Sequence, residues 1–248
     1  MNGPEPTQAQ RAYYAQTASH FDEWHLHTDD EHQTSLKWID VLFSDETLPS
    51  ILDVGSGTGR ALMFFGGGRR FVVGAEPSYG QIAQAVKNGI PANRIVQASG
   101  YDLPFADQSF DAVVECGMLH HVKKPQRVIQ EMFRVARKAV FISDSNRFGE
   151  GKARYLKVVL GRLGLWPIVE FLKTGGRGYH FSEKDGHFYS FSVYDHLDQI
   201  RALAERVWIL PVTATHRRSW FYPLLTHGHV LVCAFKEGFG PAPGQRRS

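Results

Sequence analysis

The stretch ILDVGSGTGR, from Ile51 to Arg60, places a short apolar strand directly before three glycines at alternate positions. Glycine adopts positive φ angles at no steric cost, so such a turn lets a ligand approach the backbone closely. No lysine follows the glycines as in a P-loop, and their G-x-G-x-G spacing differs from the G-x-G-x-x-G of dinucleotide-binding turns. Asp53 stands just before the first glycine, where a carboxylate favours a cation over a pyrophosphate. The turn therefore predicts a ligand that is cationic at one end.

Strands and helices alternate on both sides of this turn. The patterns predict strands at 50–55, 70–77, 93–99, 110–117, 138–144, 208–215 and 227–236, and helices at 8–24, 31–43, 59–66, 79–90, 125–137 and 193–207. Such alternation is typical of a parallel sheet with helices on both faces. The last two strands are close enough in sequence to form an antiparallel pair. We therefore expect an α/β, Rossmann-like, doubly wound and mostly parallel seven-stranded sheet with an antiparallel edge hairpin.

The alternation is interrupted after residue 144, which we interpret as an insertion into one domain rather than a second domain. Two short apolar-faced helices are expected there, divided near 161–164. The predicted organisation is a single domain over 1–248, with covering helices at 1–45, a cofactor-binding core at 51–145, a helical lid insertion that binds the acceptor at 146–190, a helix and edge strands at 191–236, and a disordered tail at 237–248.

The composition is that of an ordinary globular protein, with 43% hydrophobic and 21% charged residues. The net charge of +3 is too small to indicate a nucleic-acid partner. Cys116 and Cys233 are the only cysteines, so a disulfide framework is not expected and a reducing cytoplasm is the simpler location. No stretch approaches the ~18 apolar residues of a membrane span, so we expect no stable membrane insertion.

Glu76 ends the second predicted strand, about 20 residues after the glycines. A carboxylate at this place can accept hydrogen bonds from both hydroxyls of a ribose. The expected ligand then has a ribose and a cationic arm and needs no phosphate. S-adenosylmethionine (SAM) fits this description.

Four segments in order resemble the class I SAM-dependent methyltransferases of small-molecule type. They are ILDVGSGTGR as the first motif, GAEPS at the ribose-binding strand end, and the two later motifs within SGYDLPFADQSFDAVVECGMLHHV. The resemblance covers residues 30–145 well and 190–236 in outline. It implies SAM as cofactor and a methyltransferase activity.

The resemblance also implies the residues that hold the cofactor. Asp53 and the glycines would line the methionine end, Glu76 would hold the ribose, and residues 99–101 would flank the adenine. Ser99 departs from the acidic residue that many members carry there, which puts that adenine contact in doubt. For Tyr14, ordinary helix packing is the alternative. Glu115 and Cys116 would lie under the methionine part. The set of cofactor candidates is Tyr14, Asp53, Gly55, Ser56, Gly57, Glu76, Ser99, Gly100, Tyr101 and Glu115, with Cys116 beside Glu115.

His120, His121 and Asp144 are the catalytic candidates. His120 and His121 come just after the predicted strand at 110–117, and Asp144 ends the next one, at the edge where ligands bind in such sheets. Methylation of a hydroxyl is helped by a general base, and histidine titrates near neutrality. Some sugar O-methyltransferases of the family use a His–His pair and an Asp at these places. The alternatives are a structural histidine that caps the next helix and an aspartate that caps its own loop.

The insertion predicts the acceptor. Its mixture of polar and aromatic side chains suits a saccharide, and segments such as GLWPIVEFLKT resemble methyltransferases of bacterial polysaccharide pathways, with actinobacterial mannose-based polysaccharides as a candidate. A phenolic or lipid-like acceptor and a non-catalytic cofactor-binding partner are the alternatives. The apolar helices at 155–172 are expected to cover the sheet or form a homodimer contact, or else to hold a lipid tail or membrane surface. Mg²⁺ on Asp144 with Glu183 or Asp185 is a further candidate, although no metal-binding spacing is present.

Overall fold

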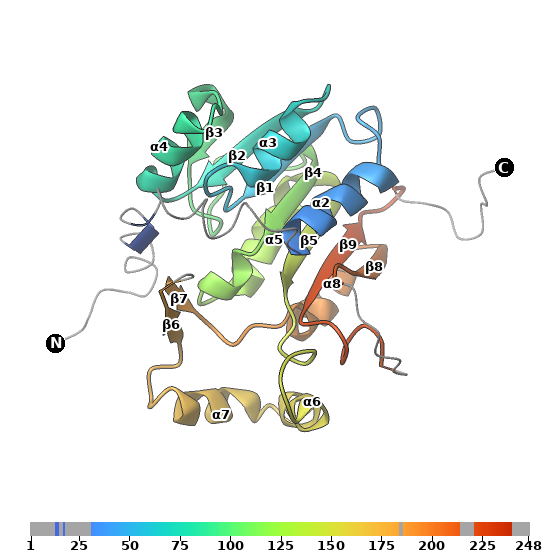
Figure 1. The fold of residues 1–248 in the computed structure, drawn as a ribbon. Helices are drawn as coiled ribbons and strands as arrows, with labels where there is room; N and C mark the ends of the chain where they lie inside the picture. The colour runs from blue at the N-terminus through green and yellow to red at the C-terminus, as the bar shows by residue number, and fades with distance from the viewer. Residues whose placement is uncertain (1–12, 15–16, 18–30, 184–185, 214–220, 240–248) are drawn as a thin grey trace.

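The fold is a seven-stranded sheet with strand order β3-β2-β1-β4-β5-β9-β8 (Figure 1). The computed structural model describes residues 13–14, 17, 31–183, 186–213 and 221–239. The strands are β1 (Ser50–Val54), β2 (Phe71–Glu76), β3 (Ile95–Gln97), β4 (Phe110–Cys116), β5 (Ala136–Ser145), β8 (Arg206–Pro211) and β9 (His229–Phe235). The first five run parallel, whereas β9 is antiparallel to both β5 and β8. The predicted fold class and its antiparallel edge pair are confirmed.

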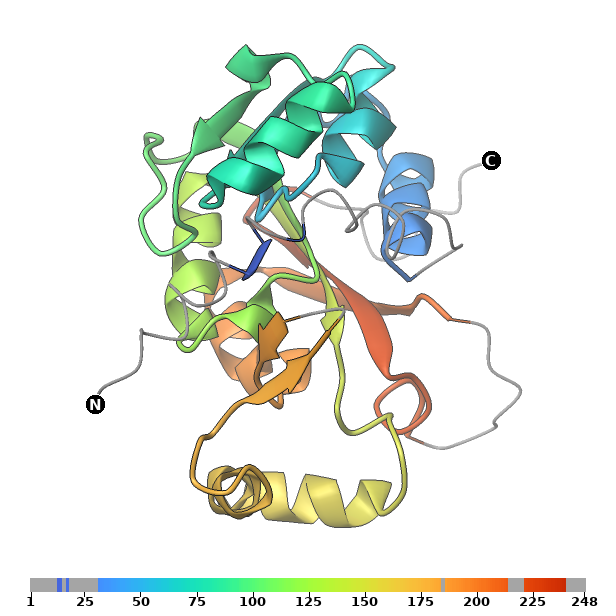
Figure 2. The ribbon, with the colours of Figure 1, turned by 60° about the vertical axis from the view of Figure 1, so that its left-hand side comes forward.

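Helices pack on both faces of the sheet, as Figures 1 and 2 show. One face is covered by α5 (Pro125–Val135) and α8 (Leu197–Leu203), and the other by α2 (Glu31–Leu42), α3 (Arg60–Gly66) and α4 (Tyr79–Lys87). Within β1, Leu52 faces the first of these cores and Ile51 the second. Since both faces are buried, the strand is apolar almost throughout instead of alternating with polar residues.

Several element boundaries differ from the expectation. The helix predicted over 193–207 is a 3₁₀ turn, Val193–His196, followed by α8, and the chain then enters β8 at Arg206. Similarly, the chain leaves α5 at Val135 and enters β5 at once. In both places backbone pairing with a neighbouring strand overrides the local helical pattern. Most of the helix predicted at 8–24, and 240–248 of the predicted tail, lie outside the described residues.

The insertion forms two helices, α6 (Arg154–Arg162) and α7 (Trp166–Lys173), divided where expected. They lie at one end of the molecule, away from the sheet, in both ribbon views (Figures 1 and 2). A small antiparallel pair follows, β6 (His180–Ser182) and β7 (Gly186–Phe188), which was not predicted. Trp166 anchors α7, since its side chain is buried and its Nε1 donates to Ser190 Oγ at 3.0 Å. No helix in the described part of the chain is long and apolar enough to cross a bilayer.

Candidate active site

A cavity that is partly open to solvent lies at the carboxyl ends of β1, β2 and β4. All the predicted cofactor residues except Glu115 line it. Sequence reasoning did not assign a cofactor role to several other lining residues, which are Thr58, Arg60, Ala61, Pro77, Gln81, Gly117, Met118, Val122 and Val128. Six of them lie inside the quoted motifs and the other three lie in the helix that follows a motif, so their place in or next to a motif was the available signal. The site thus occupies the edge of the sheet where the sequence placed it.

The glycine turn forms the floor of the cavity. Gly55 has a φ of 75°, and a Cβ added to it would lie 2.6 Å from Met118 Cγ, so neither its conformation nor its surroundings accept a side chain. Gly57, with a φ of 53°, has more room, since the nearest atom to an added Cβ is Gln81 Oε1 at 3.9 Å. The open space over Gly57 is where a ligand can approach the backbone.

Asp53 supplies a buried carboxyl group to this floor. Only 3% of the residue is exposed. Burial, together with the charge of Glu76, raises the pKa of Asp53 to about 7. A carboxylate desolvated in this way is stabilised by a cation placed next to it. Asp53 therefore fits the positively charged end of a ligand, as the sequence predicted.

Glu76 is held firmly at the end of β2. Its Oε2 accepts from the Gly57 amide at 3.0 Å, and its Oε1 accepts from the Ser78 amide at 2.8 Å. Each carboxylate oxygen can accept more than one hydrogen bond. Glu76 therefore joins the glycine turn to β2 and lines the cavity.

His121 and Tyr14 form part of the cavity wall. The Nδ1 atom of His121 lies 2.7 Å from the carbonyl oxygen of His187 on β7. Because a carbonyl only accepts, Nδ1 carries the proton and Nε2 is the basic nitrogen of the neutral ring. The Tyr14 hydroxyl lies 3.0 Å from this Nε2. The insertion thus fixes the tautomer of a histidine that lines the cofactor cavity.

His120 pairs with Asp144 next to this wall. Its Nδ1 lies 2.7 Å from Asp144 Oδ1, and its ring centroid is 4.0 Å from that of His121. Asp144 is fully buried. Burial raises the pKa of Asp144, but the charge and hydrogen bond of His120, together with His229 and the Ser145 amide, outweigh burial and hold the pKa well below its usual range. The pair therefore consists of a buried carboxylate that orients the His120 ring through Nδ1.

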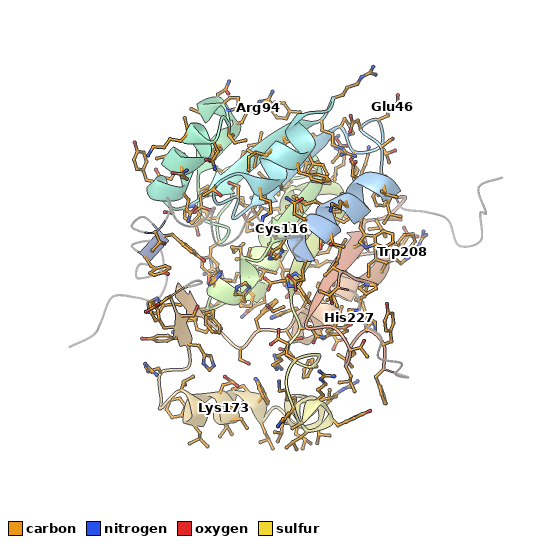
Figure 3. The ribbon with its side chains drawn as sticks, in the orientation of Figure 1. Glu46, Arg94, Cys116, Lys173, Trp208 and His227 are labelled. Carbon is orange, nitrogen blue, oxygen red and sulfur yellow. The ribbon has the colours of Figure 1, made fainter. Side chains whose placement is uncertain are left out.

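Glu115 lies elsewhere than expected. Its side chain is fully buried and does not line the cavity, which Cys116 lines instead. Figure 3 labels Cys116 near the centre of the molecule. Glu115 Oε1 accepts from the amides of Met118 and Leu119. Burial and the charge of Asp144 raise its pKa well above the usual value. Glu115 thus supports the turn that carries the histidines and has no direct contact with the cavity.

The structure gives no support to the candidate Mg²⁺ site. Among the residues that it describes, no three His, Cys, Asp or Glu side chains are grouped so that they could hold a metal ion. Asp144 is committed to His120, Glu183 is exposed, and Asp185 lies outside the described residues.

Residues 52–142 match the family model of a methyltransferase domain. An uncharacterized methyltransferase of Mycolicibacterium gilvum is 39% identical over 89 residues, which are 36% of this chain and 35% of that protein. A phosphatidylethanolamine N-methyltransferase of Cereibacter sphaeroides is 34% identical over 107 residues, 41% of this chain and 52% of that protein. The chain thus spans about a third to a half of the length of these curated relatives.

Solved structures resemble the chain over nearly its whole length. The structure of DhpI with S-adenosylhomocysteine (SAH) superposes with a TM-score of 0.61 at 18% identity. The superposition covers 98% of this chain and 100% of DhpI. At this identity the likeness shows a common fold. It extends beyond the methyltransferase domain to both ends of the sheet.

Proposed function

We propose that the chain is a SAM-dependent O-methyltransferase that acts on a hydroxyl group of a small polar acceptor, with a saccharide as the favoured class. The observation that carries this proposal is the His120–Asp144 pair at 2.7 Å, directly beside the histidine that lines the cofactor cavity. An amine acceptor needs only to be neutral, whereas a hydroxyl benefits from a base at this place.

The cavity suits SAM at both of its ends. Asp53 would accept from the amino group of the methionine part, and Glu76 from the ribose hydroxyls. Gly100 provides close packing beside the adenine, since a Cβ there would lie 3.1 Å from Val128 and 3.2 Å from Val54. When bound, SAM supplies an electrophilic methyl group.

His120 is the proposed general base. Its Nδ1 proton is fixed by the Asp144 carboxylate, which stabilises the imidazolium that forms when Nε2 accepts the proton of the acceptor hydroxyl. His121 is held by a neutral carbonyl and by Tyr14, so it receives no such charge stabilisation from these two contacts. We assign His121 and Tyr14 to the wall between cofactor and acceptor, where they orient the reacting groups.

The insertion is the proposed acceptor-binding lid. Its β7 region touches both histidines through the backbone, by the His187 carbonyl on His121 and by the Tyr189 amide, which donates to the His120 carbonyl at 2.8 Å. Aromatic and polar groups alternate beside these contacts, as in the stacked pair His180–Phe188, with ring centroids 5.3 Å apart. Rings that stack and groups that hydrogen-bond suit a saccharide.

The test measures transfer of a labelled methyl group to a panel of mannose- and glucose-based oligosaccharides. Loss of a general base costs about 100-fold or more in turnover. We expect His120→Ala and Asp144→Asn each to show this loss while SAH binding by calorimetry changes little. Asp144→Asn should also shift the acid limb of the pH–rate profile, because it acts through His120. Normal turnover in both variants would refute the base, and SAH binding without transfer to any acceptor would indicate a non-catalytic protein.

A lipid-like acceptor is the second candidate. It is favoured by the exposed apolar side chains of α6 and α7 and by the partial match to a phosphatidylethanolamine N-methyltransferase. The same assay with phospholipid and quinol acceptors separates the two candidates. An amine acceptor would leave turnover nearly insensitive to Asp144→Asn, since no hydroxyl proton has to be removed.

A further inference from the structure

The outer sides of α6 and α7 form an exposed apolar surface, which we call the α6–α7 face. It comprises eight large side chains that are 41–72% exposed, namely Tyr155, Leu156, Val159, Leu163, Leu165, Ile168, Phe171 and Leu172. Phe221 extends it, since it is 53% exposed and its ring lies 6.0 Å from that of Tyr155. A cluster of this size on a monomer marks an interaction surface.

The packing of the two helices explains why this face remains exposed. No residue of α6 is buried, and α7 buries only Trp166. Lys173, labelled in Figure 3, lies with Trp166, its Nζ 4.7 Å from the ring centroid. The buried side of α7 thus contacts the rest of the insertion through Trp166. Leu165, Ile168 and Leu172 follow one another at helical spacing on another side of α7. The α6–α7 face therefore does not cover the sheet, which was one of the expected roles.

The segment that contains these two helices carries a high net positive charge. Residues 150–177 contain six Lys and Arg against two Glu, a net charge of +4, whereas the whole chain carries only +3. The remainder of the protein is therefore close to neutral. One of the two acids, Glu170, is only 12% exposed and is engaged by Lys173 and His180. Lys152, Arg162 and Arg177 are exposed around the helices.

We propose that the α6–α7 face docks peripherally on a lipid bilayer with anionic headgroups. An apolar helix face rimmed by Lys and Arg lies in the interface of such a bilayer, with its apolar side chains among the acyl chains and its cations at the headgroups. A second copy of the chain is a poorer partner, because a two-fold contact would bring two surfaces of charge +4 together. This inference rests on the surface alone and is independent of which acceptor is methylated.

The experiment is flotation of the full chain with vesicles of phosphatidylcholine alone or with about a quarter phosphatidylglycerol. We expect binding to the anionic vesicles, weakened by high salt. One basic residue near such a surface changes binding about fivefold, so the charge reversal Arg162→Glu should weaken it about 25-fold. Its matched control is Lys87→Glu, an exposed residue that also ends a helix, on α4.

A second pair of variants tests the apolar contribution. Leu172→Asp changes a residue that is 72% exposed on α7, and Val41→Asp changes one that is 78% exposed on α2. Leu172→Asp should abolish flotation, whereas Val41→Asp should float as the wild type does, with both variants binding SAH normally. Equal loss in both variants, or no flotation of the wild type, would overturn the proposal. A dimer in light scattering that Leu172→Asp dissociates, without vesicle binding, would assign the face to a second copy.

Discussion

Replacement of Asp53 by Asn should stabilise the ligand-free protein at neutral and alkaline pH while it weakens binding of the cofactor. In the folded protein, burial and Glu76 raise the pKa of this carboxyl from 3.8 to about 7. Asparagine has nearly the same shape and no charge to desolvate. The substitution therefore removes an electrostatic cost that the wild type bears until a cation binds.

The magnitude follows from the linkage between pKa and stability. A group whose pKa is higher in the folded state than in the unfolded state favours folding at low pH, and that contribution is lost as the pH rises through the folded value. For Asp53 the loss lies between about pH 4 and pH 7. About 3 pKa units at about 1.4 kcal/mol each give at most about 4 kcal/mol. Above pH 7 the difference between variant and wild type should be constant.

The assay is denaturant unfolding of both proteins without cofactor at intervals from pH 4 to pH 9. The difference in the free energy of unfolding should grow in favour of Asp53→Asn as the pH rises. Asp198→Asn, an exposed control on α8, should change the pH profile by less than about 1 kcal/mol. If the difference in the free energy of unfolding between Asp53→Asn and the wild type did not change with pH, the assignment of Asp53 as a buried carboxyl with a raised pKa would be refuted. By calorimetry, the same variant should bind SAH at least about tenfold more weakly, since a hydrogen bond to a charged group contributes about 1.5–3 kcal/mol.

Two further predictions concern the turn and the buried acid. Gly55→Ala should weaken SAH binding, measured by calorimetry, more than Gly57→Ala does. Both substitutions strain a positive φ, but only the first drives a Cβ into Met118, which lines the cavity. Equal effects would mean that Met118 moves aside freely. Glu115→Gln should keep the free energy of unfolding at pH 7 within about 1 kcal/mol of the wild type, because burial and the charge of Asp144 disfavour the ionised carboxyl and the glutamine Oε1 can still accept from the same two amides. Glu115→Ala should cost about 1–3 kcal/mol, because the amides of Met118 and Leu119 lose their acceptor. A loss in Glu115→Gln as large as that in Glu115→Ala would refute the role of Oε1 as the acceptor for these amides.

The sequence was sufficient for the sheet and for the cofactor side of the site, because these depend on local signals. Short apolar runs bounded by turns identify buried strands, and three glycines at alternate positions indicate a tight turn whose backbone a ligand can approach. Parallel strands bring their carboxyl ends to one edge, so Asp53 and Glu76 had to meet once the strands were assigned. The two acids meet at this edge whatever their separation along the chain.

The sequence could not distinguish the roles of neighbouring residues that share the same local pattern. A strand buried on both faces is apolar throughout, so β4 gives no indication that Cys116 faces the cavity and Glu115 does not. Likewise His120 and His121 occupy one 3₁₀ turn, and their different partners lie 24 and 66 residues further along the chain. The β6–β7 pair was missed because two three-residue strands carry almost no periodic signal.

The sequence by itself determined that a glycine turn, two acids and a histidine pair lie at the carboxyl ends of the strands of a parallel sheet. The tertiary structure alone decided which histidine meets the Asp144 carboxylate, which one lines the cavity, and that the apolar sides of α6 and α7 face outward. The physical reason is that the strands, and the edge of the sheet at which a ligand binds, follow from short-range patterns in the sequence. The tautomer, charge and exposure of a side chain depend instead on groups that only folding brings within a few ångströms.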